Sequence, residues 1–192
     1  APELSGNGIV DVGCGGGTLT EAMAERGSVA LGIDLGDKPL GVARLHKLES
    51  GANVDYRRIS AEALAREAPA AFDVVACMEL LEHVPQPAQI VAACAKLAKP
   101  GGLVVVSTIN RNPKAYALAV VAAEYILRLL PTGTHDYAKF LTPAELASFA
   151  RAAGLVVAGI AGVAYNPLAR TFRIVEDSSV NYMMAFRRRP DG

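Results

Sequence analysis

The stretch Gly8-Ile-Val-Asp-Val-Gly-Cys-Gly-Gly-Gly-Thr18 decides the fold. Its first five residues are mostly apolar and predict a buried strand, whereas residues 18–26 have the apolar spacing of a helix. Four glycines lie in the turn between them. Glycine has no Cβ, so it adopts positive φ readily and lets a ligand approach the main chain. The stretch therefore predicts a sharp strand-to-helix turn with a ligand beside it.

Strands and helices alternate along the chain on the C-terminal side of this turn. The helix expected at residues 88–98 ends at the breaker run Lys-Pro-Gly-Gly, residues 99–102. This alternation predicts a parallel sheet with helices on both faces, in three layers α/β/α. The expected strands are residues 29–34, 54–59, 72–78 and 103–108, and the expected helices are residues 40–48 and 88–98.

The alternation stops after residue 108. We expect no strand in residues 109–141, only an apolar helix over residues 114–130. A helix should begin at Thr142, where Thr-Pro-Ala-Glu matches a capping box, and end before Gly154. Two late strands are expected at 155–163 and 180–186. We expect one domain over residues 1–192, with insertions 109–141 and 164–179 that face the substrate or a membrane.

Composition excludes several classes of protein. The 192 residues carry 19 basic and 19 acidic side chains, so a broad basic face for nucleic acid is not expected. The hydrophobic share of 52% excludes a disordered chain. Three cysteines at spacings that fit neither disulfides nor a metal knuckle indicate a reducing, cytoplasmic compartment. The longest apolar stretch is too short and too charged to cross a bilayer.

Two carboxylates near the glycine turn indicate the kind of ligand. A dinucleotide fingerprint needs glycine at position 18, which is threonine here. Asp34 ends the second strand, where an acidic side chain accepts hydrogen bonds from ribose hydroxyls. Asp11 precedes the glycines and is suited to a positive group. A nucleoside with a positive group is therefore expected, and S-adenosylmethionine fits because it has an adenosine, an ammonium and a sulfonium but no phosphate.

Several segments resemble one family of enzymes. The motifs DVGCGGG (11–17), GIDLG (32–36), FDVVACMELLEHV (72–84) and LAKPGGLVVVSTINRN (97–112) are similar to class I S-adenosylmethionine-dependent methyltransferases. The ubiquinone biosynthesis O-methyltransferases are the closer match, chiefly through AEYILRLLPTGTHDYAKF at 123–140. The resemblance implies a Rossmann-like sheet of seven mostly parallel strands, of which the last is antiparallel.

The resemblance also implies cofactor contacts. Gly13 and Asp34 would bind the cofactor, and Met78 would lie on the adenosine. The segment just after the third strand is where the adenine edge is expected. The family also uses an arginine upstream of the glycine turn, so we expect an N-terminal segment to be missing here. The complete set of expected cofactor residues is Asp11, Gly13, Gly15, Asp34, Leu35, Ala61, Glu62 and Met78.

An acidic and histidine cluster follows the fourth strand, at the sheet edge where ligands bind. Glu79, Glu82 and His83 suggest a divalent ion such as Mg²⁺, which lowers the pKa of a catechol hydroxyl and orients it. Alternatively His83 is a general base, or the cluster only shapes the crevice, as in methyltransferases without a metal. Mg²⁺ prefers carboxylates and water to imidazole. The resemblance to related eukaryotic enzymes implies that all three residues bind the metal.

A second candidate base, His135, lies in a polar loop, although a surface or helix-capping histidine is an alternative. The expected helix 114–130 has an unusually wide apolar face with Arg111 and Lys114 at its start. It could cover a polyprenyl tail or rest on an anionic membrane, or it could be a buried helix or a dimer face. The resemblance implies a long isoprenoid substrate and peripheral attachment to the inner face of the membrane.

Together with these observations, the resemblance implies O-methylation of a phenolic hydroxyl on a polyprenylated catechol or hydroxyphenol in ubiquinone biosynthesis, with S-adenosylmethionine and with Mg²⁺ as an optional metal. Other enzymes of that pathway are expected partners, and nucleic acid is not. One alternative is methylation of another acceptor, including a ring carbon. Another is a catalytically silent subunit that binds cofactor and lipid.

Overall fold

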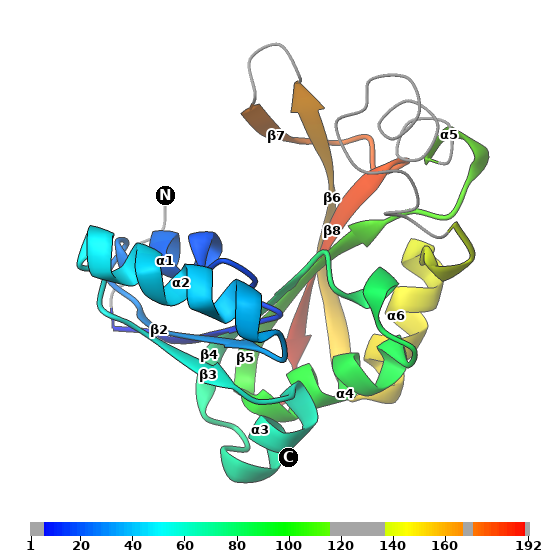
Figure 1. Cartoon of the computed structure of the whole chain (residues 1–192). Helices are drawn as coiled ribbons and strands as arrows, with labels where there is room; N and C mark the ends of the chain where they lie inside the picture. The colour runs from blue at the N-terminus through cyan, green and yellow to red at the C-terminus, as the bar shows by residue number, and fades with distance from the viewer. Residues whose placement is uncertain (1–5, 116–136, 167–170, 191–192) are drawn as a thin grey trace.

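The computed structural model describes residues 6–115, 137–166 and 171–190, and its centre is an eight-stranded sheet (Figure 1). The strand order is β3-β2-β1-β4-β5-β8-β6-β7. Strands β1 to β5 are parallel, β8 is antiparallel to β5 and β6, and β7 is antiparallel to β6. The strands are β1 (Gly8–Val12), β2 (Val29–Asp34), β3 (Val54–Arg58), β4 (Phe72–Met78), β5 (Ala98–Ile109), β6 (Leu155–Asn166), β7 (Thr171–Val175) and β8 (Asn181–Arg188).

Helices cover both faces of this sheet. Figure 1 shows α1 and α2 on one side, above β1 to β3, and α3, α4 and α6 on the other. The larger apolar core lies on the second side, and a smaller one, with Ile9 and Met23, lies under α1. The helices are α1 (Thr18–Ala24), α2 (Asp37–Ser50), α3 (Ala61–Glu67), α4 (Pro87–Leu97), α5 (Pro113–Ala115) and α6 (Pro143–Ala152), with short 3₁₀ turns η1 (Leu81–His83) and η3 (Tyr137–Lys139).

The predicted three-layer fold is confirmed, with differences in detail. The sheet has eight strands rather than seven, because β6 extends to Asn166 and pairs with β7 inside the expected insertion 164–179. Helix α3 was not predicted, although Ser60 caps it by accepting a hydrogen bond from Ala63 N. Strand β5 begins at Ala98, so the Lys-Pro-Gly-Gly run lies inside the strand rather than before it.

The second half of the chain follows the prediction where it is described. Thr142 and Glu145 form the predicted capping box at the start of α6. The expected helix 114–130 falls mostly on residues 116–136, which lie outside the described residues, as does His135. Within the described ranges, no helix is long and apolar enough to span a membrane.

Candidate functional site

The glycine turn between β1 and α1 is tied to the neighbouring strand. Gly13, Gly15 and Gly17 have φ of 76°, 54° and 85°, which only glycine adopts at little cost. The N–H groups of Gly13 and Cys14 both donate to Ile33 O, at 2.9 and 3.0 Å. A Cβ at Gly13 would lie 2.9 Å from the Leu80 side chain, whereas one at Gly15 would meet nothing within 4 Å. Gly15 is therefore where the main chain of the turn is open to a ligand.

Asp34, at the end of β2, lies beside that open point. Its Oδ2 accepts a hydrogen bond from Gly15 N at 3.1 Å, and its Oδ1 accepts one from Gly36 N at 2.7 Å. Each carboxylate oxygen can accept a further bond, so both remain available to ribose hydroxyls. Leu35 follows it, an apolar side chain with 63% of its surface exposed. The structure thus brings together three of the expected cofactor residues.

Asp11 lies below the glycine turn and is only 2% exposed. Thr20 Oγ1 donates to its Oδ2 at 2.7 Å. Burial raises the pKa of Asp11 to about 6, the Thr20 hydrogen bond opposes this shift, and the nearby Asp34 carboxylate adds to it. A buried carboxylate held by a single hydroxyl is stabilised by any cation that reaches it. This geometry suits the positive group expected there.

The remaining expected cofactor residues are more dispersed. Ala61 is buried at the start of α3, and Met78 is half-buried at the end of β4. Glu62 lines a groove of about 310 Å³ between α3 and α4, together with Arg66 and Lys96. A contact between Glu62 and adenine remains a prediction.

Two glutamates come together after β4. Ser107 Oγ donates to Glu79 Oε1 at 2.6 Å, and Thr108 Oγ1 donates to Glu82 Oε2 at 2.7 Å. Glu79 is exposed as a whole residue, but its carboxylate lies against the buried Ser107 and beside Glu82. Desolvation and the charge of Glu82 raise the pKa of Glu79 to about 7, against the lowering effect of the Ser107 bond. Such a carboxylate can take up a proton near neutral pH.

His83 does not join this pair. The 3₁₀ turn η1 places Glu82 inside, at 4% exposure, and His83 on the surface. In the described residues, no three His, Cys, Asp or Glu side chains converge as ligands for a metal ion. The three predicted ligands therefore do not come together in this structure, because adjacent positions of the turn point in different directions, and metal binding by all three stays a prediction. Two carboxylates completed by water are still a donor set that Mg²⁺ accepts.

Three residues of this region were not predicted from the sequence. The hydroxyl of Tyr56, on β3, lies 3.3 Å from both Gly17 O and Glu21 Oε1. The ring of Tyr56 occupies the space where a Cβ at Gly17 or Gly32 would be. It therefore fixes the glycine turn from the β3 side. Ser107 and Thr108 are the other two, and a polar pair at the end of an apolar strand is the signal that could have found them.

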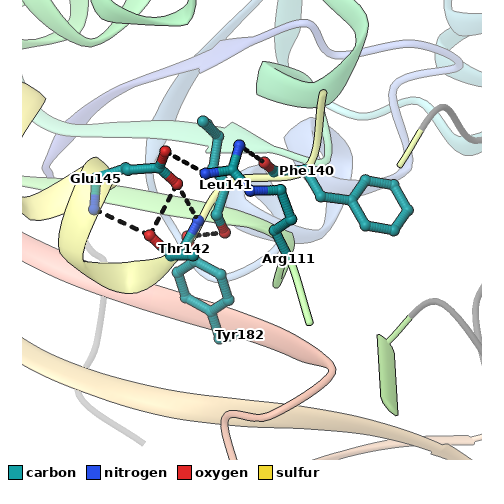
Figure 2. A network of polar contacts seen from close by, with 6 residues as sticks. All are labelled: Arg111, Phe140, Leu141, Thr142, Glu145 and Tyr182. Carbon is teal, nitrogen blue, oxygen red and sulfur yellow. Dashed lines mark hydrogen bonds and ion pairs between the residues drawn. The ribbon is translucent and has the colours of Figure 1, made fainter. Parts of the chain in front are cut away.

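A polar network follows the end of β5, the strand that carries Ser107 and Thr108 (Figure 2). Arg111 pairs with Glu145 Oε1 and donates to Phe140 O at 3.3 Å. Glu145 Oε2 accepts from Thr142 N and Oγ1, at 2.9 and 2.8 Å. Tyr182 on β8 donates to the neighbouring Leu141 O at 2.9 Å. The network joins the end of β5, the start of α6 and β8.

The cysteines have no nucleophilic role in this arrangement. Cys14, Cys77 and Cys94 are free and buried. Burial raises the pKa of Cys14 to about 12, with further contributions from Asp11 and Asp34. The pKa of Cys77 is raised by its contact with Cys94 and by burial. The thiols of Cys14 and Cys77 therefore stay protonated, which agrees with their expected packing role.

Comparison with known proteins identifies the family of the chain. Residues 10–106 match a family model described as a methyltransferase domain. The ubiquinone biosynthesis O-methyltransferase of Nitrosomonas europaea is 60% identical over 184 residues, which cover 96% of this chain and 78% of that protein. The enzymes of the same name from Stutzerimonas stutzeri and Pseudomonas aeruginosa are 59% and 58% identical, over 94% and 96% of this chain and 78% and 80% of their own. The chain belongs to the ubiquinone biosynthesis O-methyltransferase family.

Solved structures agree with this family assignment at the level of the fold. Magnesium protoporphyrin IX methyltransferase from Synechocystis, solved with bound SAH, has a TM-score of 0.68 at 20% identity, over 96% of this chain and 75% of its own. An S-adenosylmethionine-dependent methyltransferase from Methanosarcina mazei has a TM-score of 0.74 at 17% identity, over 97% and 94%. The chain therefore shares the layered α/β fold of these methyltransferases.

Proposed function

We propose that the protein transfers the methyl group of S-adenosylmethionine to a phenolic hydroxyl of a polyprenylated ring in ubiquinone biosynthesis. The observation that carries this proposal is the identity of 58–60% over nearly the whole chain with enzymes named for that activity. The arrangement of the glycine turn and its carboxylates supports it independently.

The residues present fit this cofactor. Asp34 would accept hydrogen bonds from the ribose and the exposed Leu35 would lie against the base, while the main chain at Gly15 leaves room for close approach. Asp11 is the buried partner for the ammonium. When bound, S-adenosylmethionine supplies an electrophilic methyl group on a sulfonium, and the protein's part is to hold the acceptor oxygen in line with it.

The acceptor hydroxyl must lose a proton for the reaction. A phenol has a pKa of about 10 and is a weak nucleophile at neutral pH. Glu79 takes this proton in our proposal, because its pKa of about 7 matches the working pH and Glu82 lies beside it. Mg²⁺ held by Glu79, Glu82 and water is the alternative route, and it lowers the pKa of the phenol instead. We favour Glu79 over His83 as the general base, because His83 lies on the surface. His135 stays a candidate base from the sequence.

The polyprenyl tail implies reversible contact with a membrane surface, and we retain the expectation of a cytoplasmic protein on its inner face. The basic residues Arg111 and Lys114 contribute little charge for binding an anionic membrane. Lys114 Nζ lies 2.6 Å from Asp177 Oδ2, and Arg111 pairs with Glu145. Contact with the bilayer would therefore depend mainly on apolar residues of the segment 116–130, and other enzymes of the pathway remain proposed partners.

The test is a methylation assay with a short-chain catechol and S-adenosylmethionine, with added Mg²⁺ or with excess chelator. Product carrying a new methoxy group, assigned by nuclear magnetic resonance, supports the proposal, and loss of product in chelator identifies the metal-assisted route. A new carbon–methyl bond would assign the protein to ring methylation. Binding of S-adenosylhomocysteine without any product, from catechol or from a tailed substrate in detergent, would identify a silent subunit.

A further inference from the structure

Two consecutive hydroxyl residues at the end of β5 each hold one glutamate of the candidate site. Ser107 and Thr108 are 3% and 0% exposed. Both side chains reach the segment that follows β4. Their hydroxyls donate to Glu79 Oε1 at 2.6 Å and to Glu82 Oε2 at 2.7 Å. These lengths are typical of strong bonds to ionised acceptors.

Ser107 also holds the main chain of Glu79. Glu79 has φ of 50°, a left-handed conformation that is costly for a residue with a side chain. Its N–H donates to Ser107 O and to Ser107 Oγ, both at 3.1 Å. The Ser107 hydroxyl thus accepts from the main chain of Glu79 and donates to its carboxylate. Strained backbone of this kind is found mainly at functional sites.

Thr108 compensates the burial of Glu82. A carboxylate at 4% exposure is unfavourable unless it is hydrogen-bonded. The hydroxyl of Thr108 occupies Oε2, which leaves Oε1 of Glu82 to interact elsewhere. In the same way Ser107 occupies Oε1 of Glu79 and leaves Oε2. One oxygen of each carboxylate is therefore fixed by β5, and the two carboxylates also contact each other through a side-chain hydrogen bond.

We propose that Ser107 and Thr108 are positioning residues for methyl transfer, which hold the paired carboxylates of Glu79 and Glu82 in place for the acceptor hydroxyl. The inference rests on the proposed function, in which these glutamates serve the acceptor. It applies whether they take the proton directly or hold Mg²⁺, because both routes need the two carboxylates in fixed places.

The first experiment removes each hydroxyl with little change of shape. Ser107→Ala and Thr108→Val should lower kcat about tenfold or more, the effect expected for a lost bond to a charged group, with KM for S-adenosylmethionine changed less than twofold. Thr108→Ser should restore most of the turnover. Ser28→Ala is the matched control, because Ser28 is also buried but its hydroxyl has no hydrogen-bond partner among the described residues. If Thr108→Val does not fold, Thr108→Cys, of similar size and with a weak donor, replaces it.

Double variants separate positioning from a purely structural role. Ser107→Ala should cause no further loss of kcat in a Glu79→Ala background, because its partner is already gone. Thr108→Val should likewise have no further effect on Glu82→Ala. Full multiplication of the losses in these pairs would overturn the inference, and so would unchanged kcat in both single hydroxyl variants while the glutamate variants are impaired. Full activity of Glu79→Ala and Glu82→Ala would instead overturn the proposed role of the glutamates.

Discussion

Asp34 Oδ2 accepts a hydrogen bond from the main-chain N–H of Gly15 at 3.1 Å. The carboxylate expected to bind ribose therefore also ties the glycine turn to the end of β2. Its other oxygen is bonded to Gly36 N, at the start of α2. Cofactor binding and the shape of the turn are consequently linked through one side chain.

We predict that Asp34→Ala weakens binding of S-adenosylhomocysteine more than any other single change in the site. Hydrogen bonds to a charged group contribute about 1.5–3 kcal/mol each, so a loss of affinity of at least about tenfold is expected in calorimetric titration. Asp34→Asn should lose less, because its amide oxygen still accepts. Asp37→Ala is the matched control, since Asp37 is exposed and pairs only with Arg58 at the surface. An unchanged affinity in Asp34→Ala would contradict the assignment.

Cofactor binding should depend on pH through Asp11. Its pKa is raised to about 6, mainly by burial, so the free protein holds a proton there below pH 6. An ammonium favours the ionised form, so binding releases that proton and affinity rises with pH up to about 6, then levels off. Titration with S-adenosylhomocysteine between pH 5 and 8 should show this rise in affinity below about pH 6. Asp11→Asn should remove this pH dependence and bind S-adenosylhomocysteine more weakly at pH 8. An affinity that does not change with pH in the unaltered protein would argue against the Asp11–ammonium contact.

Glu79→Ala and Glu82→Ala should lower turnover more than they lower cofactor affinity. The glutamates lie after β4 and act on the acceptor in our proposal, whereas the cofactor is held mainly by β1 and β2. We expect a fall in kcat of about 10²-fold, within the range for loss of a general base. If the unaltered protein loses activity in chelator and recovers it with Mg²⁺, the glutamates act as ligands. Full activity in chelator assigns them to proton transfer.

Sequence patterns predicted the parts of the site that depend on local backbone chemistry. The glycine turn, Asp34 at a strand end and the Thr142 capping box follow from short-range rules for φ, strand edges and helix starts. Contacts between segments far apart in the chain did not follow. Tyr56 reaches the turn from 39 residues away, and Thr108 reaches Glu82 from 26 residues away. No periodicity encodes such a pairing, because it depends on which strands become neighbours.

The orientation of His83 is a second feature that sequence patterns could not predict. Three metal-capable residues within five positions suggested one site, but η1 places Glu82 inside and His83 outside. The direction of a side chain in a single irregular turn is set by local dihedral angles that the residue types do not determine. The additional strand β7 was also not predicted. It is a short strand at the edge of the sheet, and it depends on pairing with β6 rather than on a pattern in its own residues.

The tyrosine that contacts the glycine turn gives a further prediction. Tyr56→Leu should weaken cofactor binding and lower the melting temperature, because it removes the ring packed over Gly17 and Gly32. Tyr56→Phe keeps the ring and loses only the hydroxyl contacts with Gly17 O and Glu21, so it should bind nearly as well as the unaltered protein. Calorimetric titration and thermal unfolding measure both effects. Equal affinity in Tyr56→Leu and Tyr56→Phe would contradict a role for the ring.

Contact with membranes should depend on apolar side chains of residues 116–130, which lie outside the described residues. Replacing Ile126 and Leu127 with Glu should abolish co-sedimentation with anionic liposomes and preserve activity on a short-chain catechol. Salt should weaken the attachment of the unaltered protein only slightly, because Lys114 and Arg111 are already paired with Asp177 and Glu145 and the apolar contribution is not screened. Strong loss of binding in moderate salt would show that charge dominates instead. Unfolding of the double variant would show that these side chains belong to the protein core, and the membrane proposal would then be wrong.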